Sequence, residues 1–159
     1  MSLLCKRTST RLGAVLLAAS DAGLAGLWFE GQQHMPDTSA WREQAHPLLD
    51  QAAQQLDDYL AGHRTSFDVP LTPAWGTNFQ QSVWRALQGI AYGQTTTYGE
   101  LAKYLGQPQA ARAIGAAVGR NPWSVIVPCH RVLGTNGALT GYAGGLERKR
   151  ALLALEGVI

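Results

Sequence analysis

The fold of the second half of the chain is decided by residues 97–119, which read TYGELAKYLGQPQAARAIGAAVG. Thr97 and Glu100 have the spacing of a capping box, so we expect a helix that begins there and ends at Gly106. Pro108 suits the first turn of a second helix, which we expect to run to Gly119. Two helices joined by a short turn that contains glycine form a helix-turn-helix pattern.

The second helix of this pattern has little with which to read base edges. Its small residues Ala110, Ala111, Ala113 and Gly115 allow a close approach of the backbone but cannot read a donor and acceptor code. Arg112 is its long cation, which fits contact with phosphates and the minor groove rather than sequence readout. The alternative is a small-residue helix packed tightly in a core, because its aliphatic side chains must also be buried.

The residues before this pattern predict one more helix and a separate first unit. A capping box over residues 77–80 starts a helix that ends at Gly89. Residues 12–30 predict two strands around a Ser-Asp-Ala-Gly turn, and residues 48–61 predict a helix. FDVPL, residues 67–71, predicts an edge strand. We therefore expect an α+β protein with an α/β domain over 1–74 and a second domain over 75–159.

Composition favours a globular chain without a metal centre. Apolar residues make up 46% and charged residues 15% of the 159 residues. Cys5 and Cys129 do not form a disulfide framework, and neither C-x-x-C nor H-x-x-x-H occurs, so no metal and no cofactor are expected. No apolar stretch is long enough to span a membrane. The basic residues before LGAVLLAAS, residues 12–20, imitate a signal peptide, but the run is short and contains Gly13. A reducing, cytoplasmic setting is therefore expected.

The charge of the chain is divided unevenly. Residues 1–90 hold six Lys or Arg against eight Asp or Glu, whereas residues 91–159 hold seven against three. The basic half is the half that carries Cys129. This asymmetry fits a polyanionic partner, although solvated surface arginines would give the same totals.

Three reactive groups stand together in VIVPCHRVLG, residues 125–134. Residues 125–127 predict a buried strand, which Pro128 ends, so that Cys129 lies at a strand end. An ordinary thiol with a pKa of about 8.5 is mostly protonated at neutral pH and needs a base or a cation to become a nucleophile. Neighbours on a strand point to opposite faces, so His130 would act through a water or a turn. The alternative is a buried, inert cysteine.

Glu156 breaks a local rule. It lies in the last turn of the helix predicted from LERKRALLALEG, where the helix dipole disfavours a negative charge. Such a violation is expected where a residue serves function, and an imidazole base needs an orienting acceptor. We therefore pair Glu156 with His130. The alternative is an exposed glutamate near the end of the chain.

A glycine-rich loop lies between the thiol and this helix. Its backbone N–H groups can approach a ligand closely, and Tyr142 in its middle could stack on a planar ring. The alternative is a plain flexible loop. The glycines are Gly134, Gly137, Gly141, Gly144 and Gly145.

PCHRV, with GYAGGLERKRALLALEG after it and TTTYGELAKYLGQPQAARAIGAAVGRNP before it, resembles the 6-O-alkylguanine-DNA alkyltransferase family. The resemblance is dense from about residue 76 to 157 and looser near the start. It implies an N-terminal ribonuclease-H-like α/β domain and a C-terminal winged-helix-like domain. It also implies DNA repair by transfer of an alkyl group from O6 of guanine, or O4 of thymine, to a cysteine that is used once.

The resemblance assigns roles to the site residues. Cys129 would accept the alkyl group, His130 would be its base through a water, and Glu156 would orient that histidine. Asn121 would brace the turn between the second helix and the site. The loop around Tyr142, Ala143 and Gly144 would hold the base.

The resemblance also implies how DNA is bound. Arg112 would enter double-stranded DNA from the minor groove and fill the gap left by the flipped nucleotide, independently of sequence. Tyr98 would press on the adjoining phosphate and donate to the base as it leaves. Some relatives carry zinc in the first domain, but Cys5 stands alone here, so no metal is carried over. No obligate protein partner is implied.

Two other functions remain open from the residues. A non-catalytic DNA lesion sensor would bind damaged duplex without being modified. A cysteine hydrolase would need turnover through an acyl intermediate, and it would leave the Arg112 helix unexplained.

Overall fold

The computed structural model describes residues 3–159, which form two compact units. The first comprises the chain up to Ala74 together with Pro122–Ile126, and the second comprises Trp75–Asn121 and Val127–Ile159. The segment 122–126 was expected in the second domain. That the two units fold as separate domains stays a prediction. Within residues 3–159, no helix is both long and apolar enough to cross a membrane.

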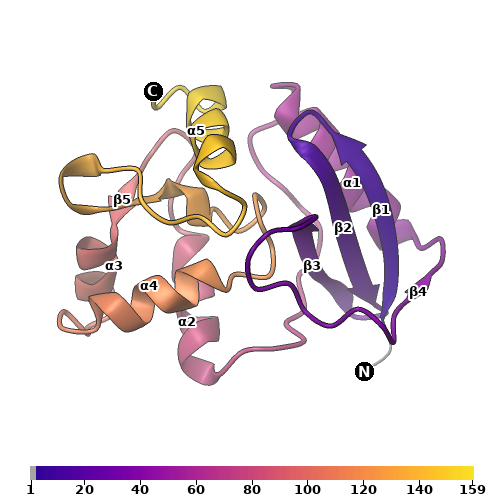
Figure 1. Cartoon of the computed structure of the whole chain (residues 1–159), viewed down its shortest axis with the longest axis horizontal. Coiled ribbons are helices and arrows are strands. Elements are labelled where there is room, and N and C mark those ends of the chain that lie inside the picture. Colours follow the sequence, from indigo (N-terminus) through magenta and orange to yellow (C-terminus); the bar gives the residue numbers. More distant parts are fainter. Residues whose placement is uncertain (1–2) are drawn as a thin grey trace. The chain divides into compact units, whose positions relative to one another are not determined.

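The first unit is a four-stranded sheet with one helix against it (Figure 1). The strand order is β3-β2-β1-β4, antiparallel except for the short β1–β4 pair. Side chains of β2 and β3 are buried on both faces, because α1 packs on one face and loop residues cover the other. The elements are β1 (Leu4–Thr10), β2 (Gly13–Ser20), β3 (Gly23–Phe29), β4 (Arg42–Glu43) and α1 (Pro47–Leu60).

Two features of this unit differ from the sequence analysis. β1 was not predicted, because LCKRTST lacks an apolar face along most of its length, yet it pairs with β2 over seven residues. FDVPL does not form an edge strand. It makes a single parallel bridge from Leu71 to Leu24, because Pro70 offers its carbonyl oxygen to Leu24 N at 2.8 Å but has no N–H to donate.

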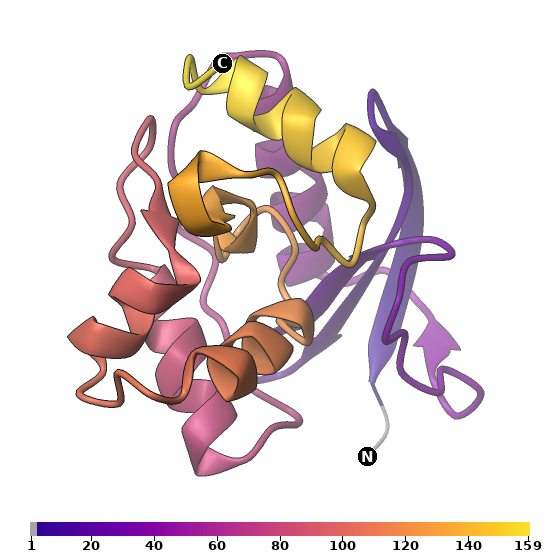
Figure 2. The same cartoon turned by 60° about the vertical axis from the view of Figure 1, so that its left-hand side comes forward.

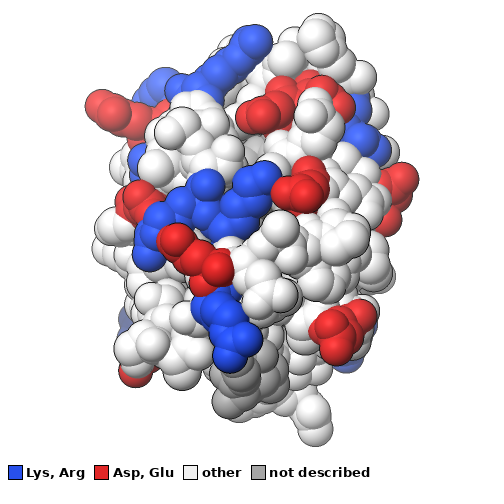
Figure 3. All heavy atoms as spheres, turned by 90° about the vertical axis from the view of Figure 1, so that its right-hand side faces the viewer, with Lys and Arg blue, Asp and Glu red and all other residues white. Residues whose placement is uncertain are grey.

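The basic side chains of β1 are paired with acids. Lys6 lies 2.8 Å from Asp50, and Arg7 contacts Glu43 at 3.2 Å and also Glu30. Figure 3 shows basic and acidic side chains interspersed on one face of the molecule. The basic charge of β1 is therefore matched by neighbouring carboxylates.

The second unit is helical and contains the predicted helix-turn-helix (Figure 2). Thr77 and Gln80 form the expected capping box of α2, whereas at Thr97 only the bond from Glu100 N to its hydroxyl is made. The elements are α2 (Asn78–Leu87), β5 (Thr96–Thr97), α3 (Tyr98–Tyr104), α4 (Ala111–Gly119), η1 (Cys129–Arg131), β6 (Val132–Leu133), η2 (Thr135–Gly137) and α5 (Leu146–Leu155).

The second helix of the pattern begins later than predicted. It starts at Ala111, so Pro108 lies in the turn instead of the first helical turn. Ala110 is its N-cap and makes no side-chain capping bond. The helix is held on α2 by Trp84, whose indole N–H donates to the carbonyl oxygen of Ala117 at 2.8 Å.

Residues 125–127 do not form the predicted strand. Val125 has φ +72°, the left-handed region that a β-branched residue rarely adopts, so the chain turns there. Cys129 consequently begins the 3-10 turn η1 and does not end a strand. An apolar run alone cannot distinguish a buried strand from a buried turn.

Candidate active site

The nucleophile candidate is a buried thiol at the start of η1. Cys129 is 6% exposed, and burial raises the pKa of its thiol, which favours the protonated form. A hydrogen bond from the Asn121 side chain, the charge of Lys149 and the backbone N–H groups of Cys129 and His130 lower that pKa in turn. The site therefore offers donors for a thiolate but needs an acceptor for its proton.

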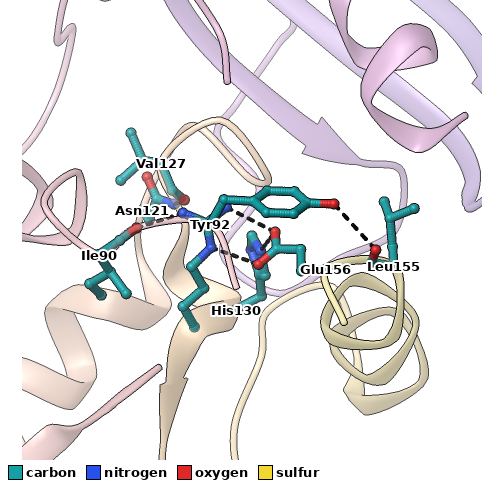
Figure 4. Close-up of polar contacts among 8 residues, drawn as sticks. Ile90, Tyr92, Asn121, Val127, His130, Leu155 and Glu156 are labelled. Carbon is teal, nitrogen blue, oxygen red and sulfur yellow. Dashed lines mark hydrogen bonds and ion pairs between the residues drawn. The ribbon is translucent and has the colours of Figure 1, made fainter. Parts of the chain in front are cut away.

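The acceptor candidate is His130, which is fully buried and hydrogen-bonded to a carboxylate. Its Nε2 lies 2.7 Å from Oε2 of Glu156, as Figure 4 shows. Within residues 3–159, the other ring nitrogen, Nδ1, has no hydrogen-bond partner. Burial lowers the pKa of His130, and this outweighs the opposite effect of Glu156. A neutral ring that donates through Nε2 leaves Nδ1 as the proton acceptor.

Glu156 is the C-cap of α5 and is buried rather than exposed. The unfavourable helix dipole is offset because its carboxylate accepts from two partners, His130 and Arg131. Arg131 binds both carboxylate oxygens, at 2.7 and 2.9 Å. No separate role was predicted for Arg131, although it stands next to His130 in the motif.

Asn121 connects the end of α4 to the thiol segment. Its side-chain N–H donates to the carbonyl oxygen of Val127 at 2.9 Å (Figure 4). Because Asn121 follows Arg120, the C-cap of α4, this bond fixes the segment before Cys129 relative to the helix. Val127 and Asn121 are both buried.

Tyr98, the first residue of α3, lies between α4 and the glycine-rich loop. Its hydroxyl donates to the carbonyl oxygen of Thr140 at 3.4 Å. A Cβ atom added to Gly115 would lie 3.6 Å from the Tyr98 ring, and one added to Gly141 would lie 3.6 Å from its hydroxyl. A Cβ atom at either position would be in ordinary van der Waals contact with the tyrosine, so Tyr98 packs close to both backbone segments. Burial, and then the nearby Cys129, raise the pKa of Tyr98, so its hydroxyl keeps its proton.

The loop after β6 is held by a lysine that sequence reasoning missed. Lys149 is fully buried, and its Nζ donates to the carbonyl oxygens of Val132, Thr140 and Gly141 at 2.6, 2.9 and 3.1 Å. Burial lowers its pKa to about 8. Its spacing from Leu152 and Leu153 on the apolar side of α5 was a signal for this burial.

The other predicted loop residues lie in the turn that leads to α5. Tyr142 and Ala143 are half-buried and Gly144 is buried. The Tyr142 carbonyl oxygen accepts from Gly145 N at 2.9 Å, and the Gly144 carbonyl oxygen accepts from Arg148 at 3.0 Å. The loop is therefore fastened at several points rather than plainly flexible.

The helix α4 has a buried side and an open side. Ile114, Ala117 and Val118 are buried, while Arg112 and Ala113 are exposed. The buried side agrees with packing in a core, whereas contact of the open side with DNA stays a prediction. Of the remaining predicted contacts, Ala110, Ala111 and Gly115 are half-buried.

The surface of residues 91–159 carries fewer basic side chains than the sequence contains in this half. Two of its seven cations, Arg131 and Lys149, are buried in the site and cannot face a polyanion. The exposed ones include Lys103, Arg112 and Arg120.

Comparisons with known proteins agree on one family. Residues 78–158 match the profile described as 6-O-methylguanine DNA methyltransferase, DNA binding domain, and residues 3–73 match its ribonuclease-like domain. A methylated-DNA–protein-cysteine methyltransferase of Methanosarcina acetivorans is 50% identical over 92% of this chain and 93% of its own length. One of Mycolicibacterium paratuberculosis is 48% identical over 91% and 87%.

A solved structure of similar sequence points to the same family. The Mycobacterium tuberculosis protein OGT, solved in complex with DNA, is 44% identical over 98% of this chain and 92% of that chain, with a TM-score of 0.88.

Proposed function

This chain belongs to the 6-O-methylguanine DNA methyltransferase family, whose activity is the direct reversal of DNA alkylation, and we propose that its alkyl acceptor is Cys129. The observation that carries the proposal is the buried pair of His130 and Glu156, 2.7 Å apart, directly after the buried thiol of Cys129 in the chain. The substrate would be O6-methylguanine in duplex DNA, and O4-methylthymine as well.

The chemistry follows from these groups. His130 Nδ1 takes the thiol proton through a bridging water, while the hydrogen bond from Asn121 and the charge of Lys149 stabilise the thiolate. The sulfur attacks the methyl carbon in line, and the bond between the methyl carbon and O6 breaks. Because a thioether is not hydrolysed, each molecule acts once.

Tyr98 and the loop would supply the other half of the reaction. The protonated hydroxyl of Tyr98 donates to the guanine as it leaves. Backbone groups of Tyr142, Ala143 and Gly144 hold the flipped base, and Lys149 fixes the loop that presents them. Preorganised donors of this kind stabilise charge that develops on a leaving group.

The DNA-binding surface would be the open side of α4. Its small residues Ala110, Ala111, Ala113 and Gly115 allow the backbone to approach the minor groove without reading sequence. Arg112 is exposed there and would occupy the gap left by the flipped nucleotide. Binding without sequence preference suits a repair protein, since lesions occur in any context.

The finer fold assignments are also part of the proposal. The sheet β3-β2-β1-β4 with α1 supports a ribonuclease-H-like first unit. The pair α3–α4 with the two-stranded β5–β6 sheet supports a winged-helix-like second unit. Two cysteines without a disulfide suit a reducing, cytoplasmic setting.

The test is the loss of O6-methylguanine from a duplex that carries one such base, followed by chromatography of the hydrolysed DNA. The wild-type chain should restore guanine, and Cys129→Ser should leave the lesion in place while still binding the duplex in a gel-shift assay. A wild-type chain that binds the lesion and does not restore guanine would be the lesion sensor instead.

A further inference from the structure

Arg131 is a buried cation that contacts Glu156, Ile90 and Tyr92 within the second unit. Its guanidinium donates to both carboxylate oxygens of Glu156, and Nη1 donates to the carbonyl oxygen of Ile90 at 2.6 Å. Its Cζ also lies 5.7 Å from the centroid of the Tyr92 ring. Tyr92 is fixed by a bond from its hydroxyl to the carbonyl oxygen of Leu155, 3.2 Å long (Figure 4). The guanidinium is therefore held on three sides.

The carboxylate of Glu156 is shared between Arg131 and the candidate base. Oε2 of Glu156 is 2.9 Å from Nη2 of Arg131 and 2.7 Å from Nε2 of His130. A buried carboxylate on its own favours a protonated imidazole beside it, because an uncompensated buried charge is costly. A bidentate guanidinium supplies that compensation and removes the need for a second cation.

We propose that Arg131 is a positioning residue that keeps His130 neutral by pairing with Glu156, so that Nδ1 is available for the proton of the Cys129 thiol. This inference rests on the proposed function. With Arg131 in place, the three side chains Arg131, Glu156 and His130 carry no net charge when the imidazole is neutral. Without Arg131, the pair of Glu156 and His130 would take a proton from solvent. His130 would then be protonated before the reaction begins and could not accept the thiol proton.

The charge balance holds through the reaction. The thiol proton moves from Sγ of Cys129 to Nδ1 of His130, so one negative and one positive charge form together. The sulfur electron pair forms the S–C bond, the C–O6 bond breaks, and its electron pair stays on the guanine. Tyr98 gives its proton to the guanine in place of the methyl group, and the proton held on Nδ1 of His130 is returned to Tyr98 through water. His130 and Tyr98 therefore end in the protonation states in which they began.

The groups that face His130 agree with this account. Cys129 and Arg131 belong to η1, Lys149 to α5 and Glu156 to its C-cap, while Tyr98 of α3 faces Cys129. Burial lowers the pKa of His130 most, Glu156 raises it, and Arg131 and Lys149 lower it. Removing the positive charge of Arg131 therefore removes one of the opposing effects and lets Glu156 raise the pKa.

The test is the single-turnover rate of methyl transfer from a duplex carrying one O6-methylguanine, measured from about pH 5 to about pH 9. Arg131→Gln should move the acid limb of this profile up by about one pH unit or more. Arg131→Lys, which keeps the positive charge but loses the bidentate pairing with Glu156, should move the acid limb less. Arg85→Gln, an exposed arginine on α2, should leave the profile unchanged. An Arg131→Gln profile that is lower by one factor at every pH, with its acid limb in place, would leave Arg131 a merely structural role.

A second measurement tests the charge state of the ring directly. Nitrogen NMR of the His130 ring in the wild-type chain should show a neutral ring at pH 7, protonated on Nε2 and not on Nδ1. A doubly protonated ring at that pH would overturn the inference. If the wild-type chain does not transfer methyl groups at all, the proposed function fails, whereas the ring spectra of the wild-type and Arg131→Gln chains at the same pH still decide whether Arg131 keeps the imidazole neutral.

Discussion

Asn121 and Val127 are joined by a hydrogen bond of 2.9 Å from the side-chain amide to the carbonyl oxygen. This bond spans the point at which the chain leaves α4, passes through the first unit at 122–126 and returns with the nucleophile. The same side chain hydrogen-bonds Cys129 and lowers the pKa of its thiol. Asn121 therefore both fixes the thiol segment relative to α4 and influences the reactivity of the Cys129 sulfur.

Replacing Asn121 by alanine should slow methyl transfer by roughly tenfold or more, because a hydrogen-bond donor that stabilises the thiolate is lost. It should also lower the free energy of unfolding by about 1–3 kcal/mol, since the Val127 carbonyl oxygen stays buried without its donor. Single-turnover kinetics and urea unfolding measure the two effects. Asn78→Ala, at an exposed position of α2, is the control. An Asn121→Ala chain that reacts at the wild-type rate would remove Asn121 from the site.

Replacing Lys149 by methionine should loosen the glycine-rich loop, because three carbonyl oxygens lose their common donor. Amide hydrogen exchange should then rise in residues 138–145, and transfer should slow as the base-holding loop loses its fixed geometry. Arg150→Met, an exposed neighbour on α5, should change neither quantity. Unchanged exchange in the loop of the Lys149→Met chain would contradict the clamp.

Replacing Arg112 by alanine should weaken repair of duplex DNA more than reaction with the free alkylated base. Only the duplex has a gap for the guanidinium to fill and phosphates for it to contact. Comparing the two rates for Arg112→Ala and for the exposed control Arg85→Ala separates this effect from a general loss of charge. An equal loss on both substrates would exclude insertion of Arg112 into the duplex.

The transfer rate should depend on pH through His130 and Lys149. Burial lowers the pKa of His130 below its ordinary value of about 6.5, so the ring stays neutral at pH 7 and transfer falls only as the pH drops below that value. Deprotonation of Lys149 near its pKa of about 8 leaves three acceptors with fewer donors, so the rate should fall again above that pH. A rate that rises steadily through pH 8 would contradict the role of Lys149.

The lowered pKa of His130 also makes the stability of the fold depend on pH. Because the unfolded chain binds a proton at His130 more readily than the folded chain does, stability should fall as the pH drops through about 6.5. His130→Gln should lose less stability than the wild-type chain between about pH 7.5 and about pH 5.5. Thermal unfolding at both pH values measures the difference, and equal losses in the two chains would show that His130 is not neutral in the folded state.

Local signals in the sequence predicted the helices well. The capping box at Thr77, the helix ending near Leu60 and the small residues of α4 all lie where short-range rules place them. The charge of Glu156 at a helix C-terminus likewise indicated a special environment, and the structure places it 2.7 Å from His130. These features depend on residues a few positions apart.

Features that depend on distant partners could not be predicted in the same way. β1 is polar along most of its length and is a strand because β2 pairs with it. Residues 125–127 look like a strand, yet Ser124 N donates to Leu27 O in the first unit and Val125 turns the chain back. The three acceptors of Lys149 lie 8 to 17 residues away, so its burial follows from the folded loop.

The most direct test of the account is intact-protein mass spectrometry after incubation with an excess of duplex that carries one O6-methylguanine, followed by peptide mapping. We predict that the wild-type chain gains one methyl group in place of one hydrogen, that the gain stops at one equivalent, and that it maps to Cys129. Cys129→Ser should gain nothing. A wild-type mass that stays unchanged while the duplex is bound, or a methyl group that maps elsewhere, would contradict the assignment of Cys129 as the acceptor.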